Sequence, residues 1–185
     1  MVNPFRILAL ILAVSFTALA ARADQTDPRL DGLFVELHET DNPHKARLIE
    51  RSIWNVWLYS KSPTLELLMG RVVNAKGKQK FGEALESLNT VVTIAPKYAE
   101  GWNKRATVYY LLGQFQASIA DVERTLDLEP RHFGALSGLG LIYNRLNREA
   151  PALDAFERAL TVNPHLEQAE AEVQRLRGKV KGKSI

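Results

Sequence analysis

Residues 99–132 read AEGWNKRATVYYLLGQFQASIADVERTLDLEPRH, and this stretch decides the fold. It holds two runs of helix-forming residues, which are separated by Gly113 and closed by Pro130. Proline cannot donate the next backbone hydrogen bond of a helix, so it ends one unit and sets the entry to the next. The stretch therefore predicts a hairpin of two helices.

The same unit recurs on both sides with a fixed period. Pro96, Pro130 and Pro164 lie 34 residues apart, which defines three blocks in one register: 65–98, 99–132 and 133–166. The twentieth position of each block is small, and so is the eighth position of the last two blocks. These residues are Ala84, Ser118 and Ala152 at the twentieth position, with Ala106 and Gly140 at the eighth. Small residues at both positions allow the two helices of a hairpin to approach closely, while large residues fill the space between repeats.

The period and the residues at set positions resemble the tetratricopeptide repeat family. The best match is in residues 99–132, with Trp102, Ala106, Tyr109, Gly113, Phe115, Ser118, Val122, Thr125 and Pro130. The match in 133–166 is also good, and it includes Leu136, Leu139, Gly140, Tyr143, Ala152, Phe156, Ala159 and Pro164. Block 65–98 is weaker, because Val72 and Ala75 stand where the family usually has glycine and tyrosine. The resemblance implies an all-α fold, an α-α superhelix (solenoid) of three clear repeats.

Two segments flank the repeats. Residues 24–64 are expected to form either a degenerate fourth repeat or a capping helical hairpin. Residues 167–185 are expected to form a capping helix and a basic tail, with Leu166, Ala169, Val173 and Leu176 on one face. A terminal element of this kind covers the open end of a solenoid.

The resemblance also implies where a partner binds. In this family the first helices of the repeats line a concave groove, which is suited to an extended or helical peptide. The groove positions are occupied here by Met69, Val73, Asn103, Thr107, Tyr110, Ser137, Leu141, Asn144 and Arg145. The alternative for these residues is an ordinary solvated helix face. Some family members clamp a partner's terminal carboxylate, but Met69, Val73, Gly134 and Gly138 stand where that clamp needs charges and amides, which disfavours it.

Two local features each suggest a hypothesis. Gly134 and Gly138 share one helix face, so either a partner segment or, as we favour, a neighbouring helix approaches that backbone closely. Arg105 stands where the family usually has leucine. It either pairs with a carboxylate after burying its stem or extends its head into solvent.

The first 23 residues resemble a secretory signal peptide. Arg6 precedes an uncharged apolar stretch, 7–20, and small residues suit cleavage after Ala20 or, as we prefer, Ala23. The stretch is shorter than the roughly 20 residues a membrane span needs. We therefore expect an exported chain without a stable membrane span, located in a bacterial periplasm or, alternatively, secreted.

Composition narrows the function. Without Arg6 and Arg22 the chain keeps 22 basic and 21 acidic side chains, a formal charge of +1, which is no footprint for nucleic acid. No cysteine is present, and the four histidines follow no metal-ligand spacing. We expect His132 and His165 to be polar surface residues of turns. The sequence predicts no enzyme, no catalytic or metal site and no cofactor.

The favoured function is a protein-protein interaction module, an exported adaptor or scaffold that holds a partner protein or peptide in the concave groove. The alternative is a self-associating structural component of the cell envelope, which would use Trp54, Trp57 and Tyr59 of the N-terminal hairpin as its interface. The sequence leaves the identity of the partner and the oligomeric state open.

Overall fold

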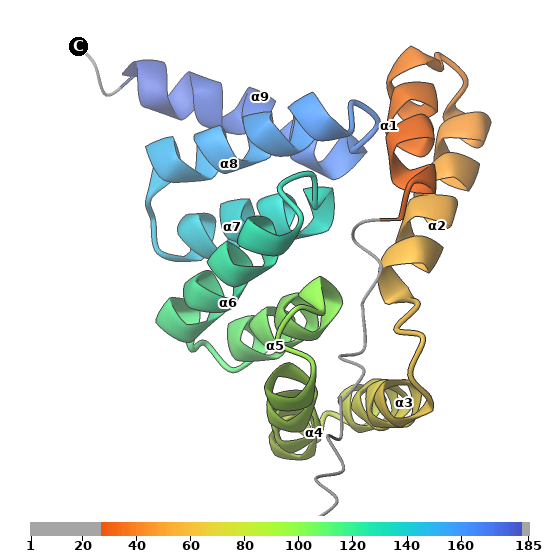
Figure 1. Cartoon of the computed structure of the whole chain (residues 1–185). Helices are drawn as coiled ribbons and strands as arrows, with labels where there is room; N and C mark the ends of the chain where they lie inside the picture. The colour runs from red at the N-terminus through yellow and green to blue at the C-terminus, as the bar shows by residue number, and fades with distance from the viewer. Residues whose placement is uncertain (1–26, 183–185) are drawn as a thin grey trace, which may run out of the picture.

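The computed structural model describes residues 27–182, and all the regular structure in this part of the chain is helical (Figure 1). The helices are α1 (Arg29–Glu39), α2 (Pro43–Leu58), α3 (Pro63–Gly77), α4 (Phe81–Ile94), α5 (Ala99–Leu111), α6 (Phe115–Leu128), α7 (Phe133–Arg145), α8 (Glu149–Val162) and α9 (Glu167–Gly182). The predicted all-α superhelix is thus confirmed. The predicted signal peptide, 1–23, lies outside the described residues.

Three helical hairpins, α3–α4, α5–α6 and α7–α8, stack on one another in chain order (Figure 1). The turn inside each hairpin contains one residue with a left-handed backbone, and these three residues are again 34 positions apart: Gln79, Gly113 and Asn147, with φ of 57°, 72° and 56°. Only Gly113 adopts this conformation without steric cost. Each second helix ends just before the repeat proline, as expected from its missing N–H.

The small residues act as the sequence predicted. Ser118 of α6 donates a hydrogen bond from its Oγ to the carbonyl oxygen of Ala106 in α5, at 2.7 Å. In the next hairpin, Gly140 lies flat against the ring of Phe156, and a Cβ added to this glycine would stand 2.7 Å from three ring atoms. In both hairpins a larger residue at the small position would push the paired helices apart.

Arg105 pairs with a carboxylate, the first of the two alternatives considered for it. Its Nε and one Nη donate to the two carboxylate oxygens of Asp121, at 2.7 and 2.8 Å, and the other Nη donates to Asn89. The guanidinium also stacks over the ring of Trp102, 4.9 Å from its centroid. This bidentate pair raises the pKa of Arg105 and links α4, α5 and α6.

The two flanking segments behave differently. At the C-terminal end, α9 covers α8 and buries Ala169, Val173 and Leu176, so the predicted capping face is formed. At the N-terminal end, α1 and α2 form a hairpin that does not add another layer to the stack. It lies alongside the stack instead (Figure 1). The connection from α2 to α3 contains Lys61, whose backbone is left-handed with φ of 54°.

Replacing Arg105 with leucine is expected to lower the free energy of unfolding by roughly 3 kcal/mol, because Asp121 would keep its buried charge without a partner. Urea denaturation followed by circular dichroism measures this change. The double variant Arg105→Leu/Asp121→Leu should recover most of the loss. Equal stability of Arg105→Leu and wild type would show that the pair contributes nothing.

Candidate functional site

The residues predicted to line the groove lie on the first helices α3, α5 and α7, and the structure divides them into two groups. Those on later turns are accessible: the side chain of Val73 is 71% exposed and that of Leu141 is 43% exposed. Thr107, Tyr110 and Asn144 are partly exposed and Arg145 is exposed. Those near the start of α5 are covered, and Asn103 is only 8% exposed. Of the nine predicted groove residues, Asn103 is thus the one that the fold buries.

The covering element is α2, which runs along the edge where the repeat turns lie. Together with α1, it meets the last residue of each repeat block. The hydroxyl of Tyr98 donates to the carbonyl oxygen of Leu58 at 2.9 Å. The ring of His132 stacks on Trp57 at 4.2 Å, with 10° between the planes. Leu166 packs against the hydrophobic core of the α1–α2 hairpin. The 34-residue period thus places three equivalent turn residues where one hairpin contacts them all.

Trp54 of α2 fits over the backbone of α7. Its ring meets Phe133 edge-on at 5.5 Å, and a Cβ added to Gly134 would stand 2.6 Å from its Cη2 atom. The close approach inferred for Gly134 is confirmed as packing within the chain, although the approaching group comes from α2 and not from a neighbouring repeat. For Gly138 the favoured alternative is wrong, since no atom of another element lies within 4 Å of the same position, and the alternative of a partner segment stays a prediction.

Beneath α2 lies a small polar cluster on α5. The carboxylate of Glu100 is fully buried; it accepts a hydrogen bond from the side-chain amide of Asn103 at 2.7 Å, and its other oxygen is 3.5 Å from the ammonium of Lys104. Burial raises the pKa of Glu100 above its ordinary value. Asn103 was predicted to contact a partner, but its amide is buried and committed to Glu100. This placement argues against direct contact between Asn103 and a partner while α2 covers it.

The prediction that both turn histidines are surface residues is wrong for His132, while His165 is partly exposed. His132 is fully buried, and its Nδ1 accepts from the backbone N–H of Ala135 at 3.1 Å. Burial, with a further contribution from the Lys104 ammonium, lowers the pKa of His132 to about 3. The Nε2 of His165 is 2.9 Å from the carbonyl oxygen of Leu37 in α1. Both turns contact the α1–α2 hairpin, and the repeat pattern does not encode this contact.

Trp54 and Trp57 are also used inside the chain. We considered them as a self-association interface, yet Trp57 is buried and both rings pack against His132 and Phe133. Tyr59 of the same hairpin remains 53% exposed. The two tryptophans therefore pack within the chain, and Tyr59 is the exposed member of the three.

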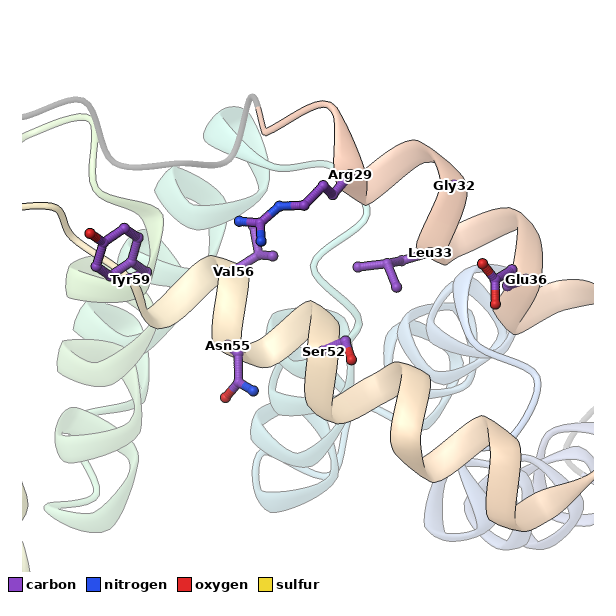
Figure 2. Close-up of a pocket in the computed structure, with 8 residues that line it drawn as sticks. All are labelled: Arg29, Gly32, Leu33, Glu36, Ser52, Asn55, Val56 and Tyr59. Atoms are coloured by element: carbon purple, nitrogen blue, oxygen red, sulfur yellow. The ribbon is translucent and has the colours of Figure 1, made fainter.

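The surface includes two hollows that bear on the site. The first, of about 720 Å³, lies between α1 and α2, and Figure 2 labels residues that line it: Arg29, Leu33, Glu36, Ser52, Val56 and Tyr59. The second, of about 960 Å³, lies between α2, α7 and α9. It is lined by Ser137 and Leu141 of the predicted groove, by Pro43, Arg47 and Glu50 of α2, and by residues 164–172. We call this second hollow the open groove.

The open groove contains residues that the sequence reasoning missed. Carboxylates of α9 form one wall, including Glu167, Glu170 and Glu172. Their spacing in the sequence shows an acidic face on a terminal helix, but nothing in it shows that this helix borders the groove. Asn144, predicted for partner contact, donates to Glu172 at 2.8 Å and accepts from Arg175 at 3.1 Å. The structure thus brings predicted groove residues and the capping helix into one site.

Residues 27–182 contain no group of three or more histidine, aspartate or glutamate side chains placed to hold a metal ion. Within the same range, no helix combines the length and the apolar character needed to cross a membrane.

Comparison with known proteins gives a consistent family. A tetratricopeptide repeat model matches residues 103–167. A TPR repeat-containing protein of Rhizobium etli is 37% identical over 186 residues, which covers 95% of this chain and 91% of the relative.

Solved structures share the fold at lower identity. The first TPR domain of Spaghetti (RPAP3), bound to the HSP90 peptide SRMEEVD, has a TM-score of 0.62 at 20% identity, covering 65% of this chain and 95% of that domain. The Yersinia enterocolitica type III secretion chaperone SycD, in complex with a peptide of the translocator YopD, has a TM-score of 0.61 at 12% identity, covering 64% and 95%.

The two glycines of α7 are expected to respond oppositely to alanine. Gly134→Ala should lower the free energy of unfolding by roughly 1–3 kcal/mol, because the new methyl group collides with Trp54. Gly138→Ala should raise it by roughly 0.5–1 kcal/mol, since alanine is the better helix former and the space is open. Urea denaturation of both variants tests this; a similar change in both would contradict the placement of Trp54.

His132 should make the protein sensitive to acid. As pH falls below about 6.5, the unfolded chain protonates this histidine while the folded chain, with its pKa at about 3, does not. Stability is therefore lost between pH 6.5 and 3, by up to roughly 1.4 kcal/mol per pH unit. Urea midpoints at pH 6.5 and 4.5 measure the slope. In His132→Phe the slope should be shallower, whereas Glu100 titrates in both proteins; parallel slopes would refute the assignment.

Proposed function

The chain belongs to the tetratricopeptide repeat family, and from this premise we propose that it is an exported adaptor that holds a segment of a partner protein in its open groove. The observation that carries the proposal is the overlap between the predicted groove and the hollow beside it. Ser137 and Leu141, predicted from family position, both line the 960 Å³ space. A hollow of this size accommodates a few side chains of an extended or helical peptide.

The surface of α7 supports the proposal. Leu141 exposes a large apolar side chain there, which water covers at a free-energy cost until a partner replaces it. One turn earlier, Gly138 presents bare backbone with open space above it. Tyr110 of α5, packed on Phe115 at 5.9 Å, adds a rigid aromatic edge. Apolar, amide and aromatic groups together suit a protein segment better than a small polar metabolite.

Binding of a terminal carboxylate by a clamp is not part of the proposal. The RPAP3 domain is bound to a peptide that ends in acidic residues. In this chain Met69, Val73, Gly134 and Gly138 stand where such a clamp would need cationic and amide side chains. Gly134 is moreover covered by Trp54. We propose instead that the open groove binds an internal segment of the partner.

Export rests on the first 23 residues, and we propose the periplasm as the destination, with secretion as the alternative. Sequencing the N-terminus of the protein from each cell fraction decides between these and a retained chain. Self-association remains the second candidate for function, carried by the exposed Tyr59. Light scattering over a range of concentrations distinguishes the two functions, because the molar mass of a monomeric adaptor stays constant whereas that of a self-associating chain rises with concentration.

The test of the adaptor function is affinity capture from a cell-envelope extract with three baits. These are the wild-type chain, Gly138→Leu, which fills the open space on α7, and Gly82→Leu, which places the same side chain on α4 where space is also open. We expect a protein that wild type and Gly82→Leu retain and that Gly138→Leu loses by at least tenfold. Circular dichroism checks that all three baits are folded.

A protein retained equally by all three baits would contradict binding in the open groove. A rise in mass with concentration, together with no retained protein, would favour the self-associating component.

A further inference from the structure

The charged residues that line the open groove are mainly acidic. They are Glu50 from α2 and Glu167, Glu170 and Glu172 from α9, against one arginine, Arg47. His165, also in the lining, is engaged with the Leu37 carbonyl. With Arg175, which pairs with Glu172 at 2.6 Å, the four carboxylates stand against two guanidinium groups, a formal charge of −2 on a chain whose formal charge is +3. This local excess is a property of the groove and not of the whole surface.

Two of these carboxylates are held in place by neighbours on other elements. Glu172 accepts from Asn144 of α7 at 2.8 Å and from Arg175 at 2.6 Å. The hydrogen bond from Arg175 holds the pKa of Glu172 below its usual value, so this group stays ionised. Glu50 accepts from the side-chain amide of Asn163 at 2.8 Å. Fixed carboxylates on opposite walls give the groove a defined electrostatic pattern.

Glu167 and Glu170 lie in the first turn of α9, where acidic side chains also stabilise the helix dipole. That role accounts for their presence at a helix N-terminus. It does not account for Glu50, which is in the middle of α2, or for Glu172 beyond the first turn. The carboxylates from α2 and from α9 thus share one effect, which is to attract a cation to the hollow.

The floor between the carboxylates is apolar. It includes Leu141, Leu166, Pro164 and the edge of Phe156. A segment that enters this space must bury an apolar side chain on the floor and present positive charge to the walls. A segment rich in glutamate would meet the same walls with repulsion, since like charges at close range disfavour association.

We propose that the open groove selects a cationic segment of a partner protein, in which lysines or arginines flank an apolar anchor. This inference rests on the proposed function, because it names the class of partner for the same groove. It also separates the chain from the RPAP3 domain bound to SRMEEVD: the charge of the preferred peptide is opposite.

The test uses the purified chain and two dye-labelled, 16-residue probe peptides. Both carry leucines at positions spaced i, i+3, i+4 and i+7; one has lysines on the other face and the second has glutamates. Fluorescence anisotropy at low salt should show at least tenfold tighter binding of the lysine probe. The preference should shrink in 1 M salt, where the screening length falls to about 3 Å.

Matched variants locate the effect. Glu167→Gln/Glu170→Gln should weaken the lysine probe several-fold, while Glu83→Gln/Glu86→Gln on α4, which removes the same charge away from the groove, should leave its affinity unchanged. Equal weakening by both pairs would show a general charge effect and overturn the inference. Circular dichroism and thermal unfolding verify that loss of the helix-dipole contribution has not unfolded α9.

The remaining outcomes separate the two proposals. If the glutamate probe binds as tightly as the lysine probe, or more tightly, and Gly138→Leu blocks it, the groove is correct and the charge inference is overturned. If the lysine probe binds but Gly138→Leu does not weaken it, the open groove is not the binding surface and the proposed function fails with it. If neither probe binds, the inference is overturned, and the capture experiment alone judges the proposed function.

Discussion

The close approach of two helices within each 34-residue unit is the constraint on which the rest of the structure depends. Gly140 against the ring of Phe156, and Ser118 bonded to the backbone of Ala106, bring the paired helices to a separation that larger residues would prevent. Because each unit is rigid and repeats with one period, equivalent residues align along one edge. The docking of α2 and the position of the groove both follow from this alignment.

The edge formed by the turns has become an internal docking surface. Tyr98, His132 and Leu166 end successive repeats, and the α1–α2 hairpin contacts each of them through a different interaction: a hydrogen bond, a ring stack and an apolar contact. An array of equivalent sites can bind any helix whose side chains match its spacing. Here the chain supplies that helix itself, with Trp54 and Trp57 as its anchors. Polar turn residues are thereby converted into core, and His132 loses access to water.

Sequence reasoning reached the features that repeat or act locally. The proline period, the small positions and the capping face of Ala169, Val173 and Leu176 all depend on contacts between neighbours in the chain, which a 34-residue pattern encodes. The docking of α2 depends on contacts such as Glu50 with Asn163, more than a hundred residues apart, and no period marks them. For that reason the burial of His132 and Asn103 was missed, as was the acidic wall that α9 adds to the groove.

The boundary between the occupied and the open part of α7 falls between two glycines one turn apart. Over Gly134 the ring of Trp54 fills the space that a side chain would need, whereas over Gly138 no described atom comes within 4 Å. A glycine in a helix lowers stability relative to alanine. At Gly134 the packing of Trp54 compensates for this loss, whereas at Gly138 no packing does. Folding alone therefore explains Gly134 but leaves Gly138 without a structural benefit. Its place beside Ser137 and Leu141, which line the open groove, is the reason that we propose a role in binding for it.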